Sequence, residues 1–146
     1  MAEGAMLVSG EIPRVTDFEK GLPISDAEVE GRLEKDPLIK DDMAVAFKVR
    51  EKGLVVISGC AHAGIVNTLN YLKELTVTKI YAVIGGFHLT GKAFEPIMDR
   101  TIAELRKFDP HVVVPPHCTG WKAISRVHQE MPDRYVHNAV GTKYIF

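Results

Sequence analysis

The chain has few cysteines and no long apolar run, and both absences narrow the classes of protein to which it can belong. Two cysteines in 146 residues are too few for a small secreted fold held by disulfides. The amino end, Met-Ala-Glu-Gly, shows neither the basic region nor the apolar core of a secretory signal. The longest apolar stretch, Ile80 to Phe87, is interrupted by two glycines and falls short of a membrane span. We therefore expect a cytoplasmic protein.

Strong charge of either sign is also absent. The formal net charge is −1, so there is no electrostatic reason to expect a nucleic acid or an anionic membrane as partner. The chain contains no nucleophile elbow, no phosphate-binding or dinucleotide-binding glycine motif, and no paired-cysteine zinc-finger spacing. Its length suits one domain, residues 1–146, with a substantial core.

Three short apolar runs bounded by glycine or proline are typical of buried strands. Each run is followed, within a few residues, by a histidine. In open α/β sheets ligands collect beyond the carboxyl ends of the strands, and imidazole is the commonest metal ligand in proteins, so we expect a metal site at this edge. The runs and their histidines are Leu54–Ile57 with His62, Ile80–Ile84 with His88, and Val112–Val114 with His117.

The local context of each histidine leaves an alternative open. Cys60 and His62 are two residues apart, so an extended backbone would present sulfur and imidazole on one side. Both groups suit zinc, and imidazole also suits iron, but a buried thiol beside an incidental histidine fits equally well. His88 follows two glycines that permit close approach or simply a turn. His117 follows two prolines that stiffen its position, which favours function. Cys60 and Cys118 could pair, although a cytoplasmic setting favours free thiols near a metal.

The remaining pattern predicts an α/β fold with a mixed sheet. A tight turn at residues 51–53 predicts a hairpin of Met43–Arg50 with Leu54–Ser58. Residues 1–40 are expected to be irregular, with a possible short strand at Met6–Val8 and at most one helical turn at 26–33. Helices are expected from Ile65, over Phe94–Phe108, and after a cap at Thr119 with Trp121 inward; Lys143–Phe146 is expected to close the sheet.

Several other polar residues are expected to have ordinary roles. Asp41 and Asp42 could accept a hydrogen bond behind the site, but a solvated turn is the simpler expectation. The other histidines are expected at the surface or at helix ends, because none follows a strand: His111, His128 and His137.

Four strings give the chain a specific resemblance. It is similar, from about Leu7 to Phe146, to the metallo-β-lactamase superfamily, and within it to the metal-dependent hydrolases related to dihydropterin ribofuranosylaminobenzene phosphate synthase. The strings are Ser-Gly-Glu-Ile-Pro-Arg14, Gly-Leu-Val-Val-Ile-Ser-Gly-Cys-Ala-His-Ala-Gly-Ile-Val-Asn67, Ile-Gly-Gly-Phe-His-Leu89 and Pro-Pro-His-Cys-Thr-Gly-Trp121.

The resemblance covers only part of a complete family member, which is an αββα sandwich of two similar halves. The first half carries a His-x-His-x-Asp-His motif that is absent here. The resemblance therefore implies that residues 41–146 are the carboxyl-terminal half and that residues 1–40 are a connecting segment. It also implies a divalent metal, zinc or else iron or manganese, and hydrolysis of a small-molecule substrate by metal-activated water. The implied ligands are His62, His88, His117 and Cys60, with the choice between Cys60 and His62 left open.

An isolated half also implies a partner. One face of its sheet would be left uncovered, and an apolar surface of that size is costly in water. The expected cover is a second copy of the chain, since the family fold has a pseudo-twofold axis, or a separately encoded amino-terminal half. The alternative to a hydrolase is a non-catalytic subunit or assembly module.

Overall fold

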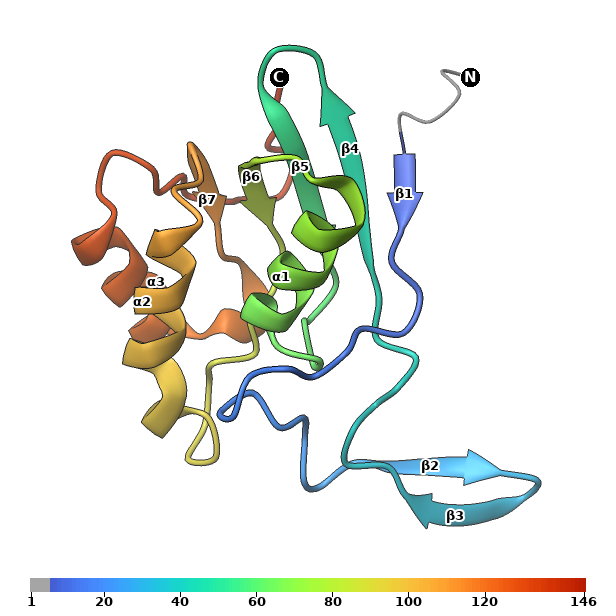
Figure 1. The fold of residues 1–146 in the computed structure, drawn as a ribbon. Helices are drawn as coiled ribbons and strands as arrows, with labels where there is room; N and C mark the ends of the chain where they lie inside the picture. The colour runs from blue at the N-terminus through green and yellow to red at the C-terminus, as the bar shows by residue number, and fades with distance from the viewer. Residues whose placement is uncertain (1–5) are drawn as a thin grey trace.

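Residues 6–146 are described by a computed structural model, in which one mixed sheet forms the centre of the molecule (Figure 1). The amino-terminal Met-Ala-Glu-Gly, which was expected not to be a secretory signal, lies outside the described residues. In this part of the chain the sheet has five strands in the order β1-β4-β5-β6-β7. Their bounds are β1 Met6–Val8, β4 Ala44–Val49, β5 Gly53–Ser58, β6 Ile80–Ile84 and β7 Val112–Val114.

The direction of the strands sets the edge at which the histidines lie. β4 and β5 form the predicted antiparallel hairpin, and β1 pairs antiparallel with β4, which confirms the short strand expected at Met6–Val8. β5, β6 and β7 are parallel neighbours. Their carboxyl ends therefore meet at one edge of the sheet, as the sequence predicted.

Three helices pack on one face of this sheet, and their apolar residues form a single core with it. α1 spans Ile65–Thr76, α2 spans Met98–Lys107 after the short 3-10 helix η1 (Glu95–Ile97), and α3 spans Trp121–Glu130 after η2 (His117–Thr119). Among the described residues, no helix is both long and apolar enough to cross a membrane. The core is formed by side chains from every helix and from β4 to β7, including Ala46, Val56, Leu69, Leu72, Val83, Ile102, Leu105, Val113 and Val127.

The opposite face of the sheet is apolar but exposed on β1, β4 and β5. The register aligns Met6 with Phe47, and Val8 with Val45 and Ile57, so these side chains share one face. This exposed apolar face, as predicted for half of a sandwich, is what a second layer would cover. Its most exposed members are Met6 at 61%, Val8 at 50%, Ile57 at 41% and Phe47 at 36%.

The structure corrects four local expectations. The helical turn expected at 26–33 is wrong, because β2 (Asp26–Val29) and β3 (Arg32–Lys35) form a separate antiparallel hairpin that projects from the body (Figure 1). Phe146 packs edge-on against Tyr81, but residues 143–146 form no strand. Trp121 is 77% exposed rather than inward. Thr119 does not cap α3, since its hydroxyl accepts a hydrogen bond from the Phe87 N–H at 3.0 Å.

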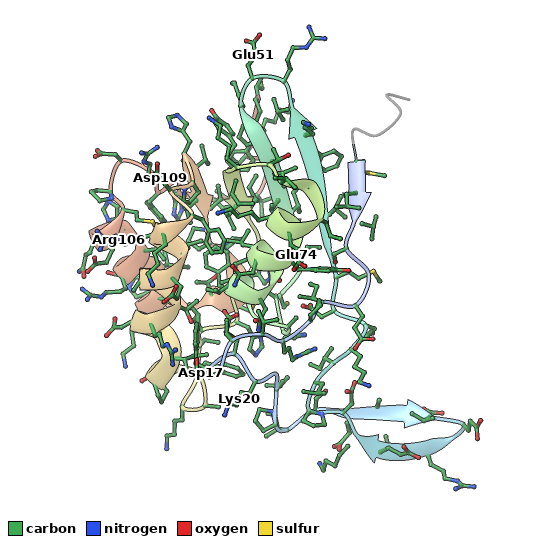
Figure 2. The ribbon with its side chains drawn as sticks, viewed as in Figure 1. Asp17, Lys20, Glu51, Glu74, Arg106 and Asp109 are labelled. Atoms are coloured by element: carbon green, nitrogen blue, oxygen red, sulfur yellow. The ribbon has the colours of Figure 1, made fainter. Side chains whose placement is uncertain are left out.

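The charged side chains lie mainly on the outside, and their pairs contribute little to the fold. Glu51 at the tip of the β4–β5 turn and Glu74 on α1 point away from the core in Figure 2. Arg106 reaches Glu130 at 2.8 Å, but the Arg106 side chain is exposed. Exposed pairs of this kind typically contribute about 0 to 1 kcal/mol. Burial of the apolar face of the helices is therefore the main stabilising contribution.

Candidate metal centre

The loops that follow β5, β6 and β7 carry the predicted site. Cys60 and His62 lie between β5 and α1, His88 lies after β6, and His117 and Cys118 lie in η2 after β7. The Gly86 N–H donates to the Gly59 carbonyl at 2.9 Å, so the first two loops are joined directly. The parallel arrangement of the strands thus brings side chains far apart in sequence to one place.

Cys60, His117 and Cys118 form the tightest group of donors. The Cys60 Sγ and the His117 Nε2 are 3.5 Å apart, and the Cys118 thiol donates to the Cys60 carbonyl at 3.7 Å. The three donor atoms lie within 4.8 Å of one another. Both cysteines are free thiols in the described structure. Cys118 was not among the predicted ligands, and its position directly after His117 was the signal that could have included it.

His62 and His88 form a second pair beside this group. Their rings are 4.6 Å apart in an edge-to-face arrangement, and the Phe94 ring packs edge-on against His88 at 4.7 Å. The Nδ1 atom of His88 is buried and has no hydrogen-bond partner among the described residues. A buried polar atom without a partner is costly, and a bound ion would satisfy it. The four predicted ligands therefore fall into two adjoining groups.

The backbone is strained at the same loops. Ala61, His88 and His117 have φ values of 52°, 45° and 32°, in the left-handed region that non-glycine residues rarely adopt. Such conformations persist where the surrounding structure enforces them, and they cluster at functional sites. The same region is adopted by residues of ordinary turns, such as Glu51 and Val77, so the strain is consistent with a functional site but does not identify one.

Gly86 makes the close approach of these donors possible. A Cβ atom at this position would lie 2.3 Å from the Cys118 Sγ and 2.6 Å from the His117 Nε2. Its backbone does not require a glycine for conformational reasons, since its φ lies outside the left-handed range. The lack of space for a side chain therefore explains why this position is a glycine.

The Gly86→Ala variant is accordingly expected to lower the affinity of the group for zinc by on the order of 10- to 100-fold, because the methyl must displace sulfur and imidazole. Zinc affinity measured by competition with a chromophoric chelator tests this. Gly59→Ala is the matched control, since a Cβ at Gly59 meets nothing within 4 Å. Equal affinity of the two variants would contradict the prediction.

Burial shifts the pKa of the site residues. Desolvation lowers the pKa of His88, the neighbouring His62 and His117 lower it further, and Asp42 opposes them. Desolvation also raises the pKa of the Cys118 thiol to about 12. His88 is thus held neutral, which is the form that binds metals. Imidazole and sulfur donors together suit zinc, so these residues fit a divalent metal of that kind.

Asp42 has a more specific role than the solvated turn expected for it. Its Oδ2 atom accepts a hydrogen bond from the Ala63 N–H at 2.9 Å. Ala63 directly follows His62, so Asp42 fixes the loop that presents this histidine. The histidines away from the site contact ordinary neighbours: His111 stacks on Tyr81, His128 lies against Tyr135, and His137 hydrogen-bonds Tyr135.

Glu19 was missed by the sequence analysis, and it ties the amino-terminal segment to the site. Glu19 is 4% exposed, and its carboxylate accepts hydrogen bonds from the N–H groups of Val66 and Asn67, at 3.0 and 2.8 Å. These are unpaired donors of the first turn of α1, whose own cap, Gly64, offers no side chain. Nothing in the sequence near Glu19 marks it, because its partners are 47 and 48 residues away.

The pKa of Glu19 makes a prediction about stability. Desolvation raises it from the usual 4.5 to about 7, against the opposing effect of the two backbone hydrogen bonds. The folded protein therefore holds this proton more tightly than the unfolded chain. The resulting stabilisation is complete below pH 4.5 and is lost as the pH rises through 7, a change of about 3 kcal/mol.

We expect Glu19→Gln to remove this part of the pH dependence. Urea denaturation of the wild type and the variant between pH 4.5 and 8 measures it, with Glu51→Gln at the exposed β4–β5 turn as the control. Parallel stability curves for wild type and Glu19→Gln would contradict the assignment.

Comparisons with known proteins bear on the fold and on the family that the chain resembles. No protein-family model matches the chain. The chain is 38% identical, over 82% of its length and 40% of the relative, to 7,8-dihydropterin-6-methyl-4-(beta-D-ribofuranosyl)-aminobenzene-5'-phosphate synthase of Methanocaldococcus jannaschii. It is 33% identical to the uncharacterized protein MJ0448 of the same organism, over 93% of its length and 48% of the relative.

A solved structure shows the same fold. The crystal structure of Tm1679, a metal-dependent hydrolase of the β-lactamase superfamily, matches with a TM-score of 0.83 and 28% identity, over 98% of this chain and 54% of that one. The chain is thus similar in sequence to the two Methanocaldococcus jannaschii proteins and similar in fold to Tm1679. The predicted resemblance and the predicted half of a β-lactamase-like fold are both confirmed. The chain spans about half the length of the relatives it matches.

Proposed function

We propose that this chain is the carboxyl-terminal half of a metal-dependent hydrolase of the β-lactamase superfamily, and that it supplies part of the metal site. The convergence of Cys60, His117 and Cys118 beside His62 and His88 carries the proposal. The metal we propose is zinc, because thiol and imidazole donors favour it over magnesium or calcium. The free thiols support a cytoplasmic location.

The protein's own residues would hold and orient the reacting groups. Cys60 and His117, with Cys118, are the proposed ligands on one side of the site, and His62 and His88 are those on the other. Asp42 and the Thr119 hydroxyl fix the backbone beside His62 and His88, through Ala63 and Phe87. A bound metal would supply Lewis-acid activation of water and polarise the bond to be cleaved.

Full activity would require a complementary half. The His-x-His-x-Asp-His motif that supplies further ligands in the family is absent from this sequence. The exposed apolar face of β1, β4 and β5 is the surface that such a half would cover. Activity is therefore expected only when a second layer completes both the sandwich and the ligand set.

One experiment tests this directly. The molecular mass in solution and the metal content are measured on the same purified sample, by light scattering and elemental analysis, followed by a screen with ester and phosphoester substrates. Near-stoichiometric zinc, with hydrolysis that appears when a complementary half is added, supports the proposal. A chain that takes up no metal under any loading condition would count decisively against it.

The exposed face also favours a second candidate, a non-catalytic assembly module that homodimerises. Its members Met6, Val8 and Ile57 would be buried in a dimer about the pseudo-twofold position. A stable dimer that remains free of metal and inactive is the outcome this candidate predicts. Metal binding with loss of metal on replacing His117 is the outcome that excludes it.

A further inference from the structure

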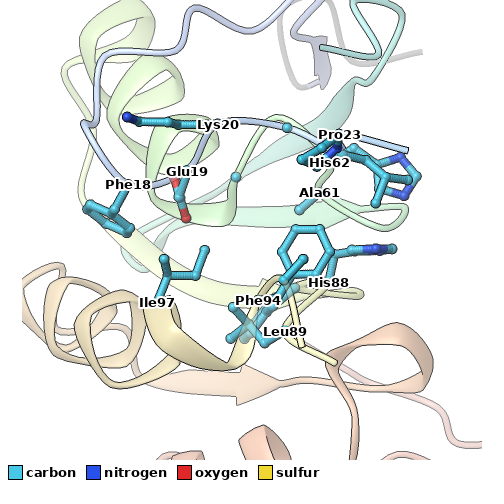
Figure 3. Close-up of a pocket in the computed structure, with 15 residues that line it drawn as sticks. Phe18, Glu19, Lys20, Pro23, Ala61, His62, His88, Leu89, Phe94 and Ile97 are labelled. Carbon is cyan, nitrogen blue, oxygen red and sulfur yellow. The ribbon is translucent and has the colours of Figure 1, made fainter. Parts of the chain in front are cut away.

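A cavity of about 200 Å³ lies immediately beside the His62–His88 pair (Figure 3). One wall is the amino-terminal segment from Phe18 to Pro23, and the other is formed by the residues that lead into α2, Phe94 and Ile97. His62 and His88 lie at one end, as Figure 3 shows. The cavity therefore adjoins the candidate metal centre, and its two walls are formed by residues that are not proposed metal ligands.

The walls are fixed rather than loosely placed. Glu19 anchors the first wall to α1, and the Asn67 side chain accepts from the Val15 and Thr16 N–H groups at 3.0 and 2.9 Å. On the other side, Arg100 of α2 pairs with Asp17 and lies 4.3 Å from the centre of the Phe18 ring. The cavity is thus preformed, which spares a ligand the entropic cost of ordering its walls.

The walls of the cavity are mainly apolar and aromatic, which suits a planar ring. The apolar side chains include three aromatic rings, and the one buried carboxylate, Glu19, already accepts two backbone hydrogen bonds. Lys20 also lines the cavity and is exposed, so an anionic substituent of a ligand could pair with it there. An apolar cavity of about 150 Å³ holds a benzene ring, so this volume suits one or two fused rings. The larger apolar side chains that line the cavity include Phe18, Phe87, Leu89, Phe94 and Ile97.

We propose that this cavity binds a planar ring of the substrate, aromatic or heteroaromatic, and holds the hydrolysable group attached to that ring at His62 and His88. This inference rests on the proposed function, because that function places the bond to be hydrolysed beside His62 and His88. The ring-binding cavity itself exists without the metal. Phe94 lines the cavity and packs against the His88 ring, so ligand binding in the cavity is expected to change the environment of His88.

The test uses indole as the probe and the metal-free chain. Indole is titrated while the ring protons of His62 and His88 are followed by NMR, with His111, which lies at the amino end of β7, as the internal reference. We expect saturable shifts at His62 and His88, no shift at His111, and nuclear Overhauser contacts from indole to the Phe18 and Phe94 rings.

A pair of matched variants locates the binding. Ala93 lines the cavity, and Ala93→Leu is expected to weaken indole binding about tenfold or more by filling it. Ala103 is exposed on α2 outside the cavity, so Ala103→Leu is expected to bind as the wild type does. Both positions are exposed, so neither change disturbs the core.

The outcomes separate this inference from the proposed function. Equal indole affinity of Ala93→Leu and Ala103→Leu, or shifts confined to the exposed sheet face around Phe47, would overturn the ring site while leaving the metal proposal intact. Ring binding in a chain that takes up no zinc would overturn the proposed function and leave the ring site standing.

Discussion

Replacing His117 with alanine is expected to weaken zinc binding by the isolated chain by on the order of 100-fold or more. In the group formed by Cys60, His117 and Cys118, His117 supplies the imidazole nitrogen and the two cysteines supply sulfur. Loss of an outer hydrogen-bond partner of a metal ligand already costs about 10- to 100-fold in affinity, so loss of a ligand should cost at least as much. Competition with a chromophoric chelator at pH 7 measures the change.

A second readout separates loss of a ligand from loss of fold. Cobalt(II) bound by Cys60 or Cys118 should give a sulfur-to-cobalt absorption band in the near ultraviolet, and Cys60→Ser should reduce it. His128→Ala is the matched control, because His128 is an exposed histidine of α3 away from the site. If His117→Ala binds zinc as tightly as His128→Ala, the group is not a metal site.

Replacing Ile57 with glutamate is expected to abolish association through the sheet, raising the dissociation constant by on the order of 100-fold. Ile57 lies on β5 in the middle of the exposed apolar face, opposite Val45 of β4. A central apolar side chain in an interface contributes about 2 kcal/mol or more, and each 1.4 kcal/mol is tenfold. A glutamate there would also be buried without a partner.

Sedimentation across a concentration series measures this change, either for the chain alone or with a complementary half. Leu75→Glu is the control, since Leu75 is about half exposed on α1, on the side that the helices already occupy. Because both positions are exposed in the single chain, the folded monomer should survive both changes. Association that persists unchanged in Ile57→Glu would show that the partner binds elsewhere.

The local pattern was enough to predict the strands and the helices of the body. Val112–Val114 and Ile80–Ile84 are short apolar runs rich in β-branched residues that favour a buried strand, and the spacing of Ile65, Leu69 and Leu72 fits one face of a helix. The same reasoning failed at residues 26–35, where Ala27 and Val29 alternate with charged residues but lie opposite Glu34 and Arg32, so that the hairpin has no continuous apolar face. That hairpin is held by its own backbone pairing, which leaves little trace in hydropathy.

Within the site, sequence alone placed His62, His88 and His117 at one edge, because the carboxyl ends of parallel strands must coincide there. Only the tertiary structure decided how they group. Gly86 admits Cys118 beside Cys60 and His117, whereas His62 turns toward His88. Similarly, Glu19 contacts the first turn of α1 from 48 residues away in the sequence, and no local sequence pattern indicates this contact. Sequence periodicity predicts which side of a helix or strand is buried. Contacts between distant loops depend instead on the space that remains once the helices and strands have packed together.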